Sequence, residues 1–232
     1  MLNLIQKYFR RKTEPIRLLQ RLAPVDLTLQ KLVHVGAHLA QERSLYEDCG
    51  YQQVLWIEGS PDVFQRLSKV LHSHQGSAQH HSLCALLTDK DGDEIALKTF
   101  SNDGKSNSIF SPTSEMASRW PSVTQTGKTE SVSTRTLDSV LAESPLAGHC
   151  DVLIVDVQGA ELLVLRGAEK TLANAKAVIA EVSTRPYYQG GVLFPELKAF
   201  LESRGFTAMS LPRRHGDMLF LRNEYLVRSK SA

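Results

Sequence analysis

The sequence predicts an α/β protein with a doubly wound, mostly parallel sheet, an antiparallel C-terminal strand and a short helical segment before the sheet. Short apolar, β-prone runs alternate with stretches of helical periodicity, which is the pattern of a sheet covered on both faces. Two of these runs, 32–36 and 151–156, end in a glycine turn or an acidic residue. Nucleotide-binding α/β units place their ligand residues at such strand ends.

Composition limits the class of protein. A chain of 232 residues with a net charge of +2 suits one domain and has no overall attraction to nucleic acid. Cys49, Cys84 and Cys150 form no C-x-x-C pair, so we expect neither a disulfide framework nor a zinc site. With no signal peptide and no apolar run of about 18 residues, a cytoplasmic location is expected.

The chain divides into an N-terminal helical, basic segment, 1–30, and a main domain, 31–232. Leu2, Ile5 and Phe9 share one face of a helix whose neighbouring positions are basic. We favour a peripheral helix that packs this apolar stripe on the domain. A helix that lies on an anionic membrane through residues 1–22 is the alternative.

From residue 31 the elements follow in order. The turn-rich segment 212–217 predicts an antiparallel hairpin between the last two strands. Ser, Asn, Thr, Gly and Pro accumulate over 101–129, which we interpret as a long loop or lid. Strands are predicted at 32–36, 53–58, 79–85, 94–100, 131–135, 151–156, 177–182, 206–211 and 217–222, and helices at 40–49, 61–73, 137–143, 161–173 and 195–204.

Gly36 and Glu58 predict a cofactor that contains a ribose. Gly36 follows the first strand, and Glu58 ends the second, 22 positions later, close to the spacing of about 20 residues found in ribose-binding α/β units. A carboxylate there can accept both hydrogens of the ribose diol. The fingerprint G-x-G-x-x-G is missing because Ala37, His38 and Ala40 follow Gly36. This favours a cofactor without phosphates and leaves an NAD(P)-type oxidoreductase as the alternative.

Asp156 is the second acidic strand end. It lies in the run IVDVQGAE at 154–161, directly before a predicted helix. The carboxyl ends of parallel strands meet at one edge, so Gly36, Glu58 and Asp156 should converge on one crevice. The structural alternatives are that Asp156 caps the following helix and that Glu161 only complements its positive end.

These motifs resemble those of the FkbM-type S-adenosylmethionine-dependent methyltransferases. The resemblance covers roughly 32–221. Two positions depart from the frequent pattern, since His34 stands where many relatives have Asp and Gln158 replaces a frequent Glu. The motifs are VGAH at 35–38, WIEGSPDVFQRL at 56–67, ALLTDKDG at 85–92, SNSIF at 106–110, VSTRTLDSVL at 132–141, DVQGAELLVLRGAE at 156–169, IAEVS at 179–183 and DMLF at 217–220.

The resemblance implies a Rossmann-like class I methyltransferase domain over 31–232, with S-adenosylmethionine as cofactor. It also implies O-methylation of a hydroxyl on a sugar, a glycan or glycolipid, or a natural product. Within the site, Gly36 and Ala37 would lie by the methionine part, Glu58 would hold the ribose, and Cys84 and Ala85 would flank adenine. The full set of expected cofactor contacts is His34, Gly36, Ala37, Glu58, Gly59, Ser60, Cys84, Ala85, Asp156 and Gln158.

Methyl transfer to a hydroxyl needs a group that takes the proton, and a positioned base contributes about 10²–10⁴-fold. The candidates are Asp156, His38, Glu181 and His81; a divalent metal held by carboxylates is the alternative, with no ligands assigned. The acceptor would be a small molecule or glycan, selected by the 101–129 and 183–191 loops. A non-catalytic, membrane-associated binding module is the remaining alternative to an enzyme.

Overall fold

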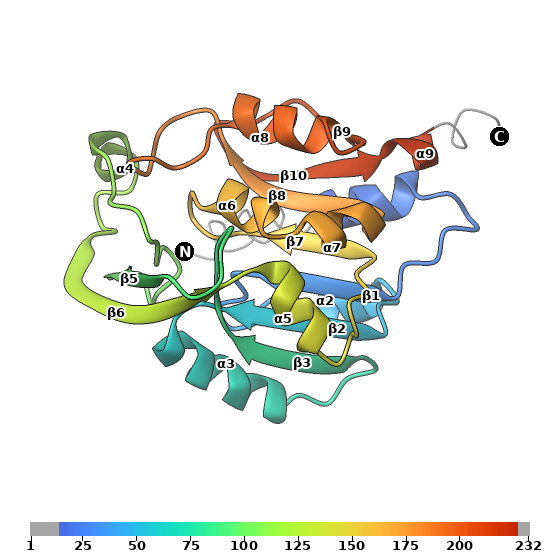
Figure 1. The fold of residues 1–232 in the computed structure, drawn as a ribbon, viewed down its shortest axis with the longest axis horizontal. Coiled ribbons are helices and arrows are strands. Elements are labelled where there is room, and N and C mark those ends of the chain that lie inside the picture. Colours follow the sequence, from blue (N-terminus) through green and yellow to red (C-terminus); the bar gives the residue numbers. More distant parts are fainter. Residues whose placement is uncertain (1–13, 227–232) are drawn as a thin grey trace.

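One seven-stranded sheet forms the centre of the molecule (Figure 1). The computed structural model describes residues 14–226. The strand order is β3-β2-β1-β7-β8-β10-β9, and every pair is parallel except the two made by β10. The predicted mostly parallel sheet with an antiparallel C-terminal strand is confirmed. Its strands are β1 (Lys31–Val35), β2 (Gln53–Glu58), β3 (Gln79–Cys84), β7 (Val152–Val155), β8 (Ala177–Ser183), β9 (Phe206–Ala208) and β10 (His215–Arg222).

The strand order reverses at β1, which pairs with β2 on one side and with β7 on the other. In register, Val35 lies beside Ile57 of β2 and Val155 of β7. The ends of these three strands therefore meet at one edge of the sheet. Open α/β sheets bind their ligands in the crevice at such a reversal point.

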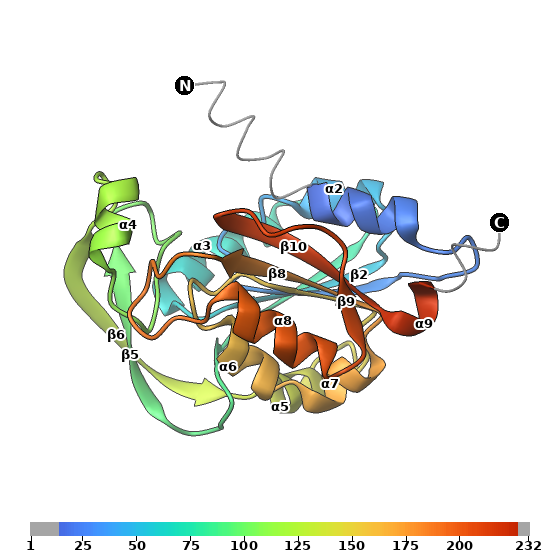
Figure 2. The same cartoon turned by 90° about the horizontal axis from the view of Figure 1, so that it is seen from above.

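Helices cover both faces of the sheet (Figure 2). Alternate residues of a strand point to opposite faces, so Val33 and Val35 enter one apolar core while Leu32 enters the other. The first core is closed by α5 (Leu137–Glu143), α6 (Glu161–Arg166), α7 (Glu169–Asn174) and α8 (Phe194–Glu202), and the second by the helix at 14–22, α2 (Arg43–Asp48) and α3 (Pro61–His72).

The helix at 14–22 packs on the domain. Ile16 and Leu19 are 1% and 0% exposed and belong to the same core as Leu32 and Trp56. Residues 1–13, where we predict a basic amphipathic helix, lie outside the described residues, so contact with a membrane stays a prediction. Across 14–226, no helix has both the length and the hydropathy needed to cross a bilayer.

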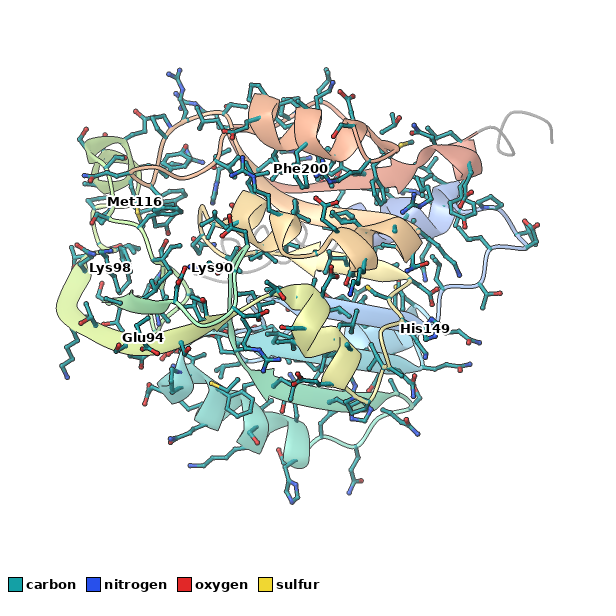
Figure 3. All side chains as sticks on the ribbon, viewed as in Figure 1. Lys90, Glu94, Lys98, Met116, His149 and Phe200 are labelled. Carbon is teal, nitrogen blue, oxygen red and sulfur yellow. The ribbon has the colours of Figure 1, made fainter. Side chains whose placement is uncertain are left out.

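The region 86–135 departs most from prediction. The strands predicted at 94–100 and 131–135 leave the main sheet and form a separate three-stranded sheet, β4-β6-β5. The predicted loop over 101–129 contains the helix α4, whose Met116 is buried (Figure 3), and the start of β6. Most of β6 is exposed and polar, so no apolar period marked its beginning. The elements are β4 (Leu86–Leu87), β5 (Glu94–Phe100), α4 (Ser114–Arg119) and β6 (Gln125–Arg135).

Several predicted bounds were wrong. The single helix expected at 161–173 is divided into α6 and α7 at Gly167, where a Cβ atom would lie 2.2 Å from the Thr88 carbonyl oxygen. The helix expected at 40–49 begins only at Arg43, and the strand expected at 206–211 ends at Ala208. The described part of the chain ends with the short helix α9 (Asn223–Leu226).

Candidate active site

The turn after β1 brings two strand ends into direct contact at Gly36. Its φ angle is +82°, and a Cβ atom here would lie 1.8 Å from the Asp156 carbonyl oxygen. The Asp156 amide donates to the Val35 carbonyl over 3.0 Å, which fixes the two strands at this distance. Glycine is thus required both by backbone conformation and by the close approach of Asp156.

Glu58 is a buried carboxylate held by backbone amides. Its Oε2 accepts from the His38 amide and its Oε1 from the Ser60 amide, each over 2.9 Å. Burial raises the pKa of Glu58 to about 7, although these hydrogen bonds oppose the shift. Each carboxylate oxygen has a second acceptor position, so the fixed side chain can still accept the two hydroxyl hydrogens of a ribose.

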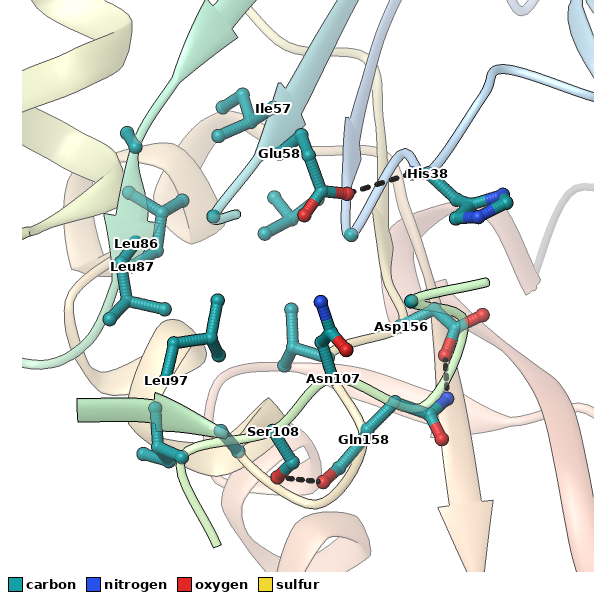
Figure 4. A pocket seen from close by; sticks show the side chains of 18 of the residues that line it. His38, Ile57, Glu58, Leu86, Leu87, Leu97, Asn107, Ser108, Asp156 and Gln158 are labelled. Atoms are coloured by element: carbon teal, nitrogen blue, oxygen red, sulfur yellow. Dashed lines mark hydrogen bonds between the residues drawn. The ribbon is translucent and has the colours of Figure 1, made fainter. Parts of the chain in front are cut away.

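A cavity opens between these strand ends, with about 600 Å³ of empty space when its mouth toward the solvent is included (Figure 4). Polar groups of Glu58, Asn107 and Gln158 face one part of it, while Leu86 and Leu97 make another part apolar. An apolar slot next to a buried carboxylate has the two features that bind a base and a ribose, so the cavity suits a nucleoside. Of the predicted cofactor residues, the cavity is lined by Gly36, Glu58, Gly59, Ala85, Asp156 and Gln158.

The other predicted cofactor residues lie outside this lining. Ser60 caps α3 by accepting from the Val63 amide, and the side chain of Cys84 is exposed. Ala37 and His34 line a smaller adjoining hollow that also reaches Asp156. There the His34 ring is hydrogen-bonded to the Tyr46 hydroxyl over 3.0 Å, within the aromatic part of the core.

His38 anchors the loop at 101–107 over the cavity. The Gln41 side-chain amide donates to its Nδ1 over 2.6 Å, so Nε2 carries the proton and donates to the Asp103 carbonyl over 2.9 Å. Burial lowers the pKa of His38, so the ring is neutral at pH 7. Both ring nitrogens are thus occupied, and His38 has no lone pair for a substrate proton. His81, on the edge strand β3, lines neither this cavity nor the second cavity described below.

Gln158 connects the carboxylates at the ends of β7 and β8. Its Nε2 donates to Asp156 Oδ1 over 2.7 Å and to Glu181 Oε2 over 2.8 Å, and its Oε1 accepts from the Tyr188 hydroxyl over 2.9 Å. The backbone of Gln158 is in the left-handed region, with φ of 56°. Strain of this kind is found where a side chain must be held in a particular direction.

His215 is the functional residue that sequence reasoning missed. Its Nε2 lies 3.2 Å from Glu181 Oε1, and its Nδ1 lies 2.7 Å from the Ser183 hydroxyl. Burial alone would lower the pKa of His215, but the Glu181 carboxylate raises it above its ordinary value. His215 and Ser183 face each other across the β8–β10 pair, a register that no local motif around residue 215 indicated.

A second cavity, with about 910 Å³ of empty space when its mouth toward the solvent is included, adjoins the first. Gln158 and Lys105 line both cavities, so they form the boundary between them. The acidic side of the second cavity comes from β8 and β10, and its other wall comes from the loop and helix at 102–123. Its lining residues are Asn102, Lys105, Ser106, Met116, Arg119, Trp120, Val123, Gln158, Glu181, Tyr188, His215, Gly216 and Asp217.

Asp156, Glu181 and Asp217 offer carboxylate oxygens that all lie within 4.8 Å of one another. Glu181 and Asp217 line the second cavity and Asp156 lines the first, and the three carboxylates together have the ligand chemistry of a hard cation such as Mg²⁺. Because hydrogen bonds from Gln158 also satisfy two of these acids, we assign no metal.

Glu47, His74 and His80 form a second group with metal-binding residue types. The Nε2 atoms of both histidines lie 2.8 Å from Glu47 Oε1. Trp56 donates to the Nδ1 of His80, and Arg43 donates to that of His74, so both Nε2 atoms carry protons. The arrangement is therefore a hydrogen-bonded network in which neither histidine ring has a lone pair for a metal.

Comparison with known proteins gives a family match over most of the chain. The family described as the methyltransferase FkbM domain matches residues 34–208. This range includes all the predicted site residues, whereas His215 and Asp217 lie beyond it. A search of curated proteins gave no significant match.

Several solved methyltransferases are distantly similar to the chain. The magnesium protoporphyrin IX methyltransferase of Synechocystis PCC 6803, solved with S-adenosylmethionine, is 10% identical, with a TM-score of 0.48 over 90% of this chain and 79% of that chain. TrmK of M. capricolum, solved with S-adenosylhomocysteine, is 6% identical, with a TM-score of 0.46 over 90% and 67%. A TehB-like methyltransferase of Corynebacterium glutamicum is 11% identical, with a TM-score of 0.44 over 95% and 96%.

Proposed function

The chain belongs to the FkbM methyltransferase family, and we propose that it transfers the methyl group of S-adenosylmethionine to a hydroxyl of a sugar, glycan or other small-molecule acceptor. The observation that carries this proposal is the junction of the two cavities. A cavity that contains the buried acid Glu58 meets a second, polar cavity at Gln158, and carboxylates that can accept a proton lie at that junction.

The residues of the first cavity suit this methyl donor. Glu58 is placed to bind the ribose hydroxyls, and Leu86 and Leu97 can enclose adenine. Asp156, next to Gly36, supplies negative charge for the cationic end of the donor. When bound, the donor supplies an electrophilic methyl group on a positively charged sulfur.

In the second cavity, Glu181 is the best-placed proton acceptor. Its oxygens receive hydrogen bonds from Gln158 and His215, which hold the carboxylate in one orientation. As the new oxygen–carbon bond forms and the carbon–sulfur bond breaks, the hydroxyl proton passes to Glu181. Holding the acceptor oxygen near the methyl carbon supplies much of the remaining rate. His215 acts through Glu181 and is therefore a positioning residue.

The structure offers no support for the oxidoreductase alternative. A dinucleotide places its pyrophosphate on a helix N-terminus directly after the glycine turn. Here α2 begins only at Arg43, and the amides of Gly36 and Ala37 already donate to the Ile57 carbonyl. The membrane-module alternative depends on residues 1–13, which lie outside the described part of the chain.

The proposal includes a compartment. Cys49, Cys84 and Cys150 are free thiols, which suits a reducing environment. We therefore place the enzyme in the cytoplasm, acting on a small molecule or glycan and not on nucleic acid.

Labelled S-adenosylmethionine tests the proposal against a panel of sugars, glycolipids and polyketides. We expect binding of the donor by calorimetry and transfer of label to an acceptor oxygen. Glu181→Gln should lower kcat by about 10²–10⁴-fold, the contribution of a general base, while donor affinity stays unchanged. Glu196→Gln, an exposed acid of α8, is the matched control. A fully active Glu181→Gln enzyme, or label only on nitrogen, would overturn the proposal.

A further inference from the structure

The second cavity is acidic on one side and basic on the other. Glu181 of β8 and Asp217 of β10 form its acidic side, and the His215 ring lies 3.2 Å from Glu181 there. Lys105 and Arg119 line the opposite wall, which consists of the 102–123 segment. Both of these cationic side chains are exposed, whereas the carboxylate of Glu181 is 9% exposed. An occupant of the cavity therefore meets fixed negative charge at one end and positive charge at the other.

The cations on this wall lack ion-pair partners. Within residues 14–226, neither Lys105 nor Arg119 forms a salt bridge. The nearby Asp103 is already paired with Arg66 over 2.6 Å. The cavity wall thus presents positive charge that the described protein does not neutralise.

Local contacts hold the Arg119 side chain in place but leave its guanidinium without an anionic partner in the described part of the chain. Its guanidinium lies 4.9 Å from the centre of the Trp120 ring and 5.9 Å from that of Tyr187. These cation–π contacts orient the side chain, and its place in the last turn of α4 suits the helix dipole. Neither contact provides the paired oxygen acceptors that the planar guanidinium can bind.

We propose that the methyl acceptor carries an oxyanion, a carboxylate or phosphate ester, which Arg119 and Lys105 bind while the reacting hydroxyl faces Glu181. This inference rests on the methyl transfer proposed above and adds the charge of the substrate. The opposite orientation would place the anion against the carboxylates of Glu181 and Asp217, which repel it, while the single His215 ring beside Glu181 offers less positive charge than Arg119 and Lys105 together. The binding wall therefore also sets which hydroxyl of a ring reaches the donor.

The space between the two ends fits a polar ring. Trp120 and Tyr188 contribute aromatic surface, and Asn102 and Ser106 contribute hydrogen-bonding groups. Aromatic surface packs on the apolar face of a ring, and the polar groups bind its substituents. An acidic sugar combines these features with one negative group.

Binding can be measured without turnover. We would titrate the protein, saturated with S-adenosylhomocysteine, with methyl glucoside, methyl glucuronide and glucose 6-phosphate. The two anionic probes should bind at least about tenfold more tightly than the neutral one, since charge-assisted hydrogen bonds are about twice as strong as neutral ones. This advantage should shrink as salt is raised. A difference between glucuronide and phosphate identifies the preferred oxyanion.

Substitutions of Arg119 and Lys105 test whether these residues cause the preference for anionic probes. Arg119→Gln and Lys105→Gln should each weaken the anionic probes by about tenfold and leave methyl glucoside unchanged. Lys128→Gln removes one exposed charge from β6, outside both cavities, and should change nothing. Equal affinity for all three probes, no binding of any probe, or an anion preference that survives the double variant would overturn the inference.

Turnover separates this inference from the function on which it rests. If anions bind through Arg119 and no acceptor is ever methylated, the methyl transfer proposal fails and the oxyanion site stands. If neutral sugars are methylated as efficiently as acidic ones, the methyl transfer proposal stands and the oxyanion inference fails.

Discussion

Gly36→Ala should be among the most damaging single substitutions in the chain. The added Cβ would lie 1.8 Å from the Asp156 carbonyl oxygen, and real Cβ contacts are essentially never shorter than 3.0 Å, so the two strand ends must separate by about 1.2 Å. That movement strains the hydrogen bond from the Asp156 amide to Val35. Together with the left-handed backbone, which costs about 1–2 kcal/mol, we expect the free energy of unfolding to fall by about 3–5 kcal/mol.

Gly50→Ala is the matched control. Gly50 has a φ of +84°, almost the same as Gly36, but nothing lies within 4 Å of the position that an added Cβ would occupy. It should lose only about 1–2 kcal/mol, the backbone cost without the collision. Urea unfolding followed by circular dichroism measures both variants, and donor affinity should fall only in Gly36→Ala. Equal destabilisation of the two variants would refute the argument from close approach.

Two further predictions concern titratable groups near the donor site. Burial raises the pKa of Glu58 to about 7 from an ordinary 4.5. Between these two pH values Glu58 is therefore protonated in the folded protein and ionised in the unfolded chain. The free energy of unfolding should fall by up to about 3 kcal/mol between pH 4.5 and 7 and then level off. Glu58→Gln should remove this fall when the free energy of unfolding is measured by urea titration at each pH. If the variant and the unsubstituted protein lose stability equally over this pH range, the prediction is contradicted. His38→Gln should lower kcat by less than about tenfold and raise KM, because His38 holds a loop. If His38→Gln instead lowers kcat by about 10²–10⁴-fold while the control His72→Gln leaves kcat unchanged, His38 is the base.

The residues of the proposed donor site could be predicted to converge because each belongs to a local motif. Gly36, Glu58 and Asp156 each follow an apolar strand, and parallel strands bring such ends to one edge. The structure places all three at one cavity. The pattern could not show that the Ala37 amide donates to the Ile57 carbonyl or that the Ser60 side chain caps α3.

The sequence predicted the loops around the proposed acceptor cavity but not the elements that build its walls. Arg119 and Trp120 lie in and directly after a short helix, inside a segment without apolar periodicity, so that segment was interpreted as a loop. His215 reaches Glu181 only because β10 runs antiparallel to β8 in one particular register. A one-residue shift of that register would turn the side chain to the other face. Such long-range pairing leaves no mark at residue 215 itself.

Gln158 shows why a departure from the family pattern can fit this site. The resemblance to the family implies a frequent Glu at this position, and a Glu would add a carboxylate beside Asp156 and Glu181. The Gln158 amide nitrogen instead donates to both acids, and the amide oxygen accepts from Tyr188. An ionised carboxylate could make neither of the first two bonds, and it would repel both neighbours. The neutral side chain therefore allows two acids to stand at the boundary of the cavities, one beside the donor and one beside the acceptor hydroxyl.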